Sequence, residues 1–189
     1  MPVHPLMPVA AALAAVLATA PAPAPAPATA SATVRQTLLT CQVATTSERP
    51  ITFSPPVKLL PRTVTAQAGI VLTGCASASP SAAHLRSGIM NVHSTGRASC
   101  AGVRDVRGKG TITWYGADGR QTGVSTVRPS VEKVAGYNPG DMLLGGRVTK
   151  GALAGSSLAG TATPTSDVNA CATKGLSAVH GTGKITFMT

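Results

Sequence analysis

Apolar and polar residues alternate with a period of two along much of the chain. In the clearest stretch, residues 62–74 (RTVTAQAGIVLTG), every second residue from Val64 to Leu72 is apolar, and these residues alternate with Thr63, Thr65, Gln67 and Thr73. Successive side chains of a β-strand point to opposite faces, so this stretch predicts a strand with one face on a core and the other in water. Residues 37–43 (TLLTCQV) predict an earlier strand in the same way.

Further strands are predicted where short runs rich in Val, Ile, Thr and aromatic residues lie between turn-like sequences such as ASPS, GADGR and TPTSD. These runs are residues 85–94, 109–115, 121–128, 143–149, 155–163 and 176–188. No stretch of ten or more residues carries a clear 3.6-residue apolar rhythm, so we expect little or no helix outside the leader. About eight short strands predict an all-β fold, a single antiparallel β-barrel or β-sandwich.

The clearest hairpin is expected at residues 110–127, GTITWYGADGRQTGVSTV. Asp118 and Gly119 stand at its centre, and both residue types tolerate the positive φ angles that tight turns need. The flanking runs are rich in Thr, Val and aromatic residues. The sequence therefore predicts two neighbouring antiparallel strands joined at this turn.

One short motif occurs twice, as GKGTITW at residues 108–114 and as GTGKITF at residues 181–187. A dinucleotide-binding glycine motif needs a third glycine and a following helix, and neither copy has them, so no cofactor is expected. Read as strands, both copies place an isoleucine and an aromatic residue on one face, and the glycines allow the backbone to bend. The predicted core residues are Ile112, Trp114, Ile185 and Phe187.

The first 32 residues differ in composition from the rest of the chain. Residues 7–20 (MPVAAALAAVLATA) form an apolar stretch of signal-peptide length that is too short to span a bilayer comfortably, and an alternating Ala-Pro run follows. Proline cannot continue a helix, so this run reads as an extended spacer. We expect residues 1–32 to be a signal peptide and leader, and residues 33–189 to be one secreted β-domain without a membrane span.

Four cysteines lie after the leader. An even number in an exported protein of this size favours two disulfides, and no pair has the spacing of a zinc site, so no metal is expected. Three pairings are open. We favour Cys75 with Cys100 and Cys41 with Cys171, because the second bond would tie the first strand to the last region.

The formal net charge is +10, from sixteen Lys and Arg residues against six Asp and Glu. Such a charge attracts anionic envelope polymers, acidic lipids or nucleic acid without specifying any of them. The one local concentration is Arg104, Arg107 and Lys109, which makes these residues the candidate anion-binding set. Exposed aromatic residues for base stacking are scarce, so no specific nucleic-acid binding is expected.

No catalytic motif is evident. There is no G-x-S-x-G, and the six acidic residues lie mostly in turn sequences and not in apolar strands. The sequence therefore predicts no enzymatic activity, and a hydrolase that uses His84, His93 or His180 with a serine or acid is the weaker alternative. A second alternative is an inhibitor of a secreted protease that presents residues 131–141, VEKVAGYNPGD, as its inhibitory loop.

The order of these features resembles a group of small secreted actinobacterial β-proteins that have an N-terminal signal and no established activity. The elements that carry the resemblance are Cys41, G-x-x-L-T-G-C at 69–75, Cys100, GKGTITWYGADG at 108–119, GGRVTKGALAG at 145–155 and CATKGLSAVHGTGKITF at 171–187. The resemblance covers most of residues 38–187 and implies export, a compact β-fold and structural cysteines. It assigns no catalytic residue. The leading hypothesis is a secreted protein that binds anionic cell-envelope or extracellular material, or a secreted protein partner.

Overall fold

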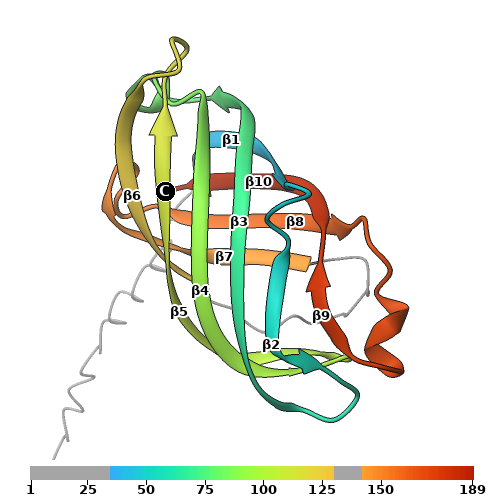
Figure 1. The fold of residues 1–189 in the computed structure, drawn as a ribbon. Helices are drawn as coiled ribbons and strands as arrows, with labels where there is room; N and C mark the ends of the chain where they lie inside the picture. Colours follow the sequence, from blue (N-terminus) through green and yellow to red (C-terminus); the bar gives the residue numbers. More distant parts are fainter. Residues whose placement is uncertain (1–34, 130–141) are drawn as a thin grey trace, which may run out of the picture. The chain divides into compact units, whose positions relative to one another are not determined.

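Eight antiparallel strands close into a barrel in the computed structural model, which describes residues 35–129 and 142–189 (Figure 1). The order round the barrel is β1-β10-β8-β7-β6-β5-β4-β3, and pairing of β3 with β1 completes the circle. The strands are β1 (Thr37–Thr45), β2 (Ile51–Val57), β3 (Arg62–Ser77), β4 (Ser87–Ser99), β5 (Gly102–Tyr115), β6 (Gln121–Pro129), β7 (Met142–Gly151), β8 (Ser157–Pro164), β9 (Leu176–Val179) and β10 (Gly181–Met188). Helical structure in the described residues is limited to two 3-10 turns, η1 (Pro80–Ala82) and η2 (Asn169–Ala172). The prediction of an all-β fold is confirmed, and of the two predicted architectures the fold is the barrel.

The strands β2 and β9 pair with each other and extend the barrel at one end. No strand was predicted at β2, because its segment, ITFSPPV, contains two prolines, which cannot donate to a sheet ladder. The predicted single strand at 176–188 is divided at His180. There the backbone leaves the ladder, since the His180 N–H donates to the Ser166 hydroxyl at 2.9 Å and its carbonyl accepts from Thr165 N–H at 2.9 Å.

The predicted hairpin at residues 110–127 is confirmed as the pairing of β5 with β6. At its turn Gly119 has φ 72°, and the Gly116 N–H donates to the Arg120 carbonyl at 2.9 Å. The Asp118 carboxylate accepts a hydrogen bond from Arg120 N–H at 3.0 Å, which closes the turn locally. Gly119 thus adopts the positive φ, and Asp118 makes the local hydrogen bond, for which these residue types are favoured in turns.

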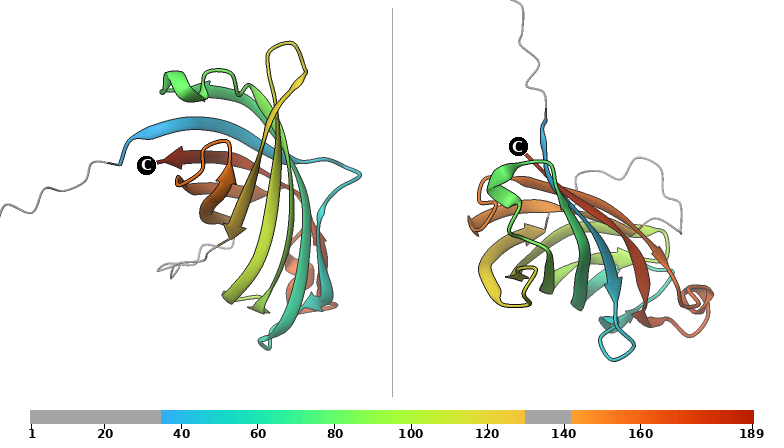
Figure 2. Two further views of the ribbon diagram at one scale, coloured as in Figure 1. Left: turned by 90° about the vertical axis from the view of Figure 1, so that its left-hand side faces the viewer. Right: turned by 90° about the horizontal axis from the view of Figure 1, so that it is seen from above.

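The two copies of the repeated motif lie on opposite walls of the barrel. They form β5 and β10, and three barrel strands separate these two on either side. The rings of Trp114 and Phe187 meet across the interior in an edge-to-face contact, with centroids 5.6 Å apart. Ile112, Trp114, Ile185 and Phe187 all have 0% of their surface exposed, so the four predicted core residues are confirmed. Figure 2 shows the strands curving round this shared interior.

A glycine in each copy lets two strands approach closely. A Cβ atom on Gly183 would lie 2.0 Å from the Thr161 carbonyl oxygen of β8, and one on Gly108 would lie 2.4 Å from the His93 carbonyl oxygen of β4. Both contacts are with backbone, which cannot swing aside. The glycines therefore serve interstrand packing, a more specific role than the bending that the sequence indicated.

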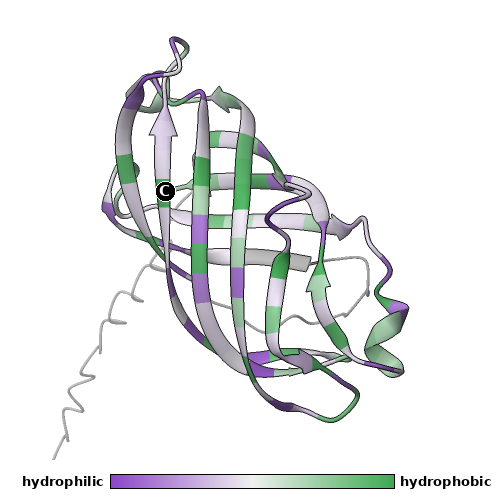
Figure 3. Cartoon of the chain, in the orientation of Figure 1, coloured by the Kyte–Doolittle hydropathy of each residue, from purple (hydrophilic) through white to green (hydrophobic). Residues whose placement is uncertain are grey.

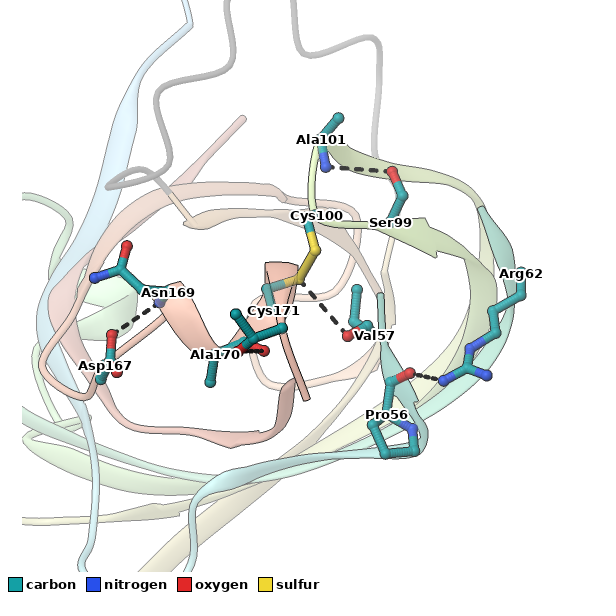
Figure 4. Close-up of a disulfide and its surroundings, with 11 residues drawn as sticks. Pro56, Val57, Arg62, Ser99, Cys100, Ala101, Asp167, Asn169, Ala170 and Cys171 are labelled. Atoms are coloured by element: carbon teal, nitrogen blue, oxygen red, sulfur yellow. Dashed lines mark hydrogen bonds between the residues drawn. A yellow bond between two sulfur atoms is a disulfide. The ribbon is translucent and has the colours of Figure 1, made fainter. Parts of the chain in front are cut away.

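The main core lies inside the barrel, and apolar and polar bands alternate along β3 and β4 in Figure 3. One buried polar group is built into this core: the Ser125 hydroxyl of β6 accepts a hydrogen bond from Trp114 Nε1 at 2.8 Å and donates to the Ala152 carbonyl. A smaller cluster, around Val57 and Val64, packs near Cys100 and Cys171. Figure 4 shows this second region, which we call the Cys100–Cys171 end of the barrel.

The disulfides join Cys41 to Cys75 and Cys100 to Cys171, so the favoured pairing was wrong. Cys41 and Cys75 lie on the paired strands β1 and β3, with Cα atoms 4.1 Å apart. Cys75 precedes the start of β4, whereas Cys100 follows its end, so the 13 residues of β4 separate them. Thirteen extended residues span about 40 Å, far beyond the reach of a disulfide. Cys100, in the β4–β5 turn, instead bonds to Cys171 of η2 across the end of the barrel.

Candidate functional site

Cationic side chains occupy the outward positions of the strands whose inward positions build the core. On β5, Gly110, Ile112 and Trp114 are buried, and Arg107 and Lys109 are exposed. The direct cross-strand neighbour of Lys109 is His93 of β4. Pairing of these two consecutive strands therefore brings a histidine beside one of the predicted anion-binding residues.

A bulge in β5 divides the predicted set of Arg104, Arg107 and Lys109. Thr95 pairs with Arg107 and Arg97 with Arg104, so two residues of β5 stand opposite one residue of β4. The bulge includes Asp105, which adopts a positive φ of 55°. Arg107 and Lys109 remain together on the outer wall, and Arg104 belongs to the Cys100–Cys171 end.

A shallow hollow of roughly 800 Å³ lies where the β1–β2 turn folds over the outer faces of β3, β4 and β5. Arg49 from the turn covers Gly69, whose added Cβ would lie 3.1 Å from the Arg49 Cβ. The polar and charged side chains that line this hollow include Glu48, Arg49, Gln67, Asn91, His93 and Lys109. Three of them are basic residue types and one is acidic.

A second hollow, of roughly 630 Å³, adjoins the first on the outer faces of β5, β6 and β7. It shares Gly108 and Lys109 with the first, and its described lining residues include four cations and no acidic residue. These cations are Arg107, Lys109, Arg128 and Lys150. We call Arg49, His93, Arg107, Lys109, Arg128 and Lys150 together the basic outer wall.

The cations of this wall have no carboxylate partner within the described part of the chain. The single ion pair found there joins Arg120 to Asp118 at 3.8 Å, in the β5–β6 turn. Arg128 of the wall stands directly opposite Arg147 on β7. Like charges placed directly across two strands destabilise a sheet, so this arrangement stores repulsion that a bound anion would relieve.

The three candidate catalytic histidines lie in separate places. His93 is on the outer wall, His84 is exposed between η1 and β4, and the His180 ring contacts the Thr45 hydroxyl at 3.3 Å. Within residues 35–129 and 142–189, no hydrogen bond joins any of these rings to a carboxylate, and no three His, Cys, Asp or Glu side chains are grouped as metal ligands. The hydrolase alternative stays a prediction that no geometry supports.

The loop at residues 131–141, predicted as a protease-inhibitory segment, lies outside the described residues. Among the residues that the structure does describe, no helix is long and apolar enough to cross a membrane.

The sequence reading missed four members of the wall: Arg49, His93, Arg128 and Lys150. Each lies apart from the other wall residues in the sequence, and it gains its cationic neighbours through strand pairing or, for Arg49, through the folding of the β1–β2 turn over β3. A signal was present for Arg128, which follows the alternation of the predicted strand at 121–128 and therefore faces outward. Nothing local identified which other strands would lie beside it.

Comparison with protein-family models, with curated proteins and with solved structures gave no match to this chain.

Proposed function

We propose that the protein is a secreted, disulfide-stabilised barrel that binds linear anionic polymers of the cell envelope or extracellular material along its basic outer wall. The observation that carries the proposal is the pair of adjoining hollows that share Lys109 and are lined by Arg and Lys residues from β5, β6, β7 and the β1–β2 turn, with His93 of β4 beside them. Two intramolecular disulfides and the apolar leader support export.

The geometry of the wall suits a repeating ligand. Neighbouring strands are about 4.8 Å apart, and Arg107 and Lys109, two residues apart on one strand, are separated by about 7 Å. The backbone positions that carry these cations are thus roughly 5–7 Å apart across three strands, so one extended anionic polymer can contact several of them at once. The barrel holds these side chains on rigid strands, so little backbone order has to be gained on binding.

Polyanion binding tests the proposal. The purified protein is titrated with inorganic polyphosphate and with polyglutamate at several salt concentrations, and affinity is expected to fall steeply as salt rises. The triple variant Arg107→Gln/Lys109→Gln/Arg128→Gln is expected to bind about tenfold more weakly, since exposed charge contacts contribute up to about 1 kcal/mol each. It is also expected to show a shallower salt dependence.

A matched control removes three charges elsewhere. Arg86, Arg120 and Lys184 are exposed, and Lys184 lies on β10, opposite the wall strand β5. The variant Arg86→Gln/Arg120→Gln/Lys184→Gln has the same net charge as the wall variant and is expected to retain most of the affinity. Equal losses in the two variants would mean that net charge alone drives binding. No binding at low salt would remove the proposed function.

A further inference from the structure

Two leucines stand exposed at the tip of the β2–β3 turn. Leu59 has 61% and Leu60 81% of its surface exposed, the largest exposures among the exposed large apolar residues of the described chain. They occupy the centre of the sequence KLLPR, between Lys58 and Arg62. Single exposed apolar residues are ordinary, but two adjacent leucines at a protruding turn between cations call for a functional explanation.

The β4–β5 turn lies beside this tip at the Cys100–Cys171 end (Figures 1 and 4). The Cys100 N–H donates to the Lys58 carbonyl at 2.9 Å, which joins the two turns directly. On β5, Val103 is 46% exposed and pairs with Ala98, which in turn pairs with Arg62 at the base of the leucine turn. We call Leu59, Leu60 and Val103 the apolar tip.

Cations flank the apolar tip in sequence and in strand register. Lys58 flanks the leucines, Arg97 and Arg104 form a cross-strand pair beside Val103, and a Cβ on Gly175 would lie 3.2 Å from the Lys58 side chain, next to Lys174. The described acidic residues at this end are Asp105 and Asp167, both exposed. Among the described residues, the charged side chains of this end are therefore mostly cations, and they lie near three exposed apolar side chains.

The tip is also held in place. The Cys100–Cys171 disulfide ties the β4–β5 turn to η2, and the Arg62 guanidinium donates a hydrogen bond to the Pro56 carbonyl across the base of the leucine turn. A turn fixed at its base can insert without losing much conformational freedom. This lowers the entropic cost of binding.

We propose that the apolar tip is a docking site for an anionic lipid bilayer, with Leu59 and Leu60 inserted among the lipid headgroups and the surrounding cations on the lipid phosphates. A soluble polyanion would satisfy the cations and leave the leucines in water, whereas a bilayer accepts both. The lipid site is separate from the outer wall, and it would orient the barrel on a membrane while the wall holds a polymer.

Vesicle binding tests the inference on the full chain. The protein is sedimented with vesicles of phosphatidylcholine alone and of phosphatidylcholine mixed with phosphatidylglycerol, and binding is expected only to the mixture. The variant Leu59→Ser/Leu60→Ser keeps every charge and is expected to partition at least about tenfold more weakly. The control Val124→Thr alters an apolar residue that is 40% exposed on β6 and is expected to bind as the parent protein does.

A second variant reports insertion directly and guards against misfolding. Leu60→Trp is expected to give an indole emission that shifts to shorter wavelength when mixed vesicles are added, while Val124→Trp gives no shift. Trp114, the one native tryptophan, is buried and contributes a constant background. Absence of the shift, or equal partitioning of the leucine variant and its parent, would overturn the inference.

These experiments test polymer binding by the wall and lipid docking by the tip separately. Polyphosphate binding that is weakened in the wall variant and kept in Leu59→Ser/Leu60→Ser assigns polymer binding to the wall alone. Insertion of Leu60→Trp without any polyphosphate binding would retain the lipid site and remove the proposed function.

Discussion

The buried hydrogen bond between Trp114 and Ser125 makes a sharp test of the barrel core. The Ser125 hydroxyl is fully buried, accepts from Trp114 Nε1 at 2.8 Å and donates to the Ala152 carbonyl. The substitution Ser125→Ala removes one oxygen and leaves both partners without this hydrogen bond. The barrel geometry and the volume of the core change little.

The expected loss of stability depends on which of the two former partners of Ser125 can form a hydrogen bond with water instead. A buried donor or acceptor that loses its partner costs about 1–3 kcal/mol. Trp114 has 0% exposure, so its indole N–H bears this cost in full, whereas Ala152 is half-buried and its carbonyl can be hydrated. We expect Ser125→Ala to lower the free energy of unfolding by about 2 kcal/mol.

Urea denaturation measures this change through the emission of Trp114 and, independently, through far-UV circular dichroism. The control Ser157→Ala removes a half-buried hydroxyl that donates to the Met188 carbonyl at 3.2 Å and is expected to cost less than about 1 kcal/mol. The Trp114→Phe variant has no indole N–H that could lose its partner. In this background Ser125→Ala is expected to lower the free energy of unfolding by a smaller amount. A cost below about 0.5 kcal/mol, or equal costs in the two backgrounds, would refute the reasoning.

Two further predictions concern the disulfide across the barrel end and the close approach of two strands. The variant Cys100→Ser/Cys171→Ser opens a link over a sequence separation of 71 and is expected to lose about 4 kcal/mol of stability by the loop-entropy estimate, measured by urea denaturation; an unchanged midpoint would contradict it. Gly183→Ala places a Cβ 2.0 Å from the Thr161 carbonyl oxygen and is expected to cost about 3 kcal/mol, whereas Gly123→Ala, whose nearest contact is 3.6 Å, is expected to be nearly neutral in thermal melts. Equal melting temperatures for the two alanine variants would rule out the role of Gly183 in close packing.

Which segments form strands, and which of their side chains point inward, could be predicted from each segment by itself. The alternation in residues 62–74 and the paired Ile and aromatic residues of the repeats predicted which side chains are buried, because the direction of a strand side chain depends on its neighbours in sequence. The turn at Asp118 and Gly119 was readable for the same reason, since turn chemistry lies within a few residues. The segment with two prolines was missed because its pairing is supported by β3 and β9 and not by its own composition.

Closure, disulfide pairing and the candidate site were decided only by the tertiary structure. Whether β3 pairs with β1 to close a barrel, which cysteine meets Cys41, and whether His93 lies beside Lys109 all depend on strand register between distant segments. A shift of one residue in register would turn every side chain of a strand to the other face, so these contacts depend on the packing of the whole core. The sequence alone placed Arg107 and Lys109 close together along the chain; the barrel decided that Arg49, Arg128 and Lys150 join them and that Arg104 does not.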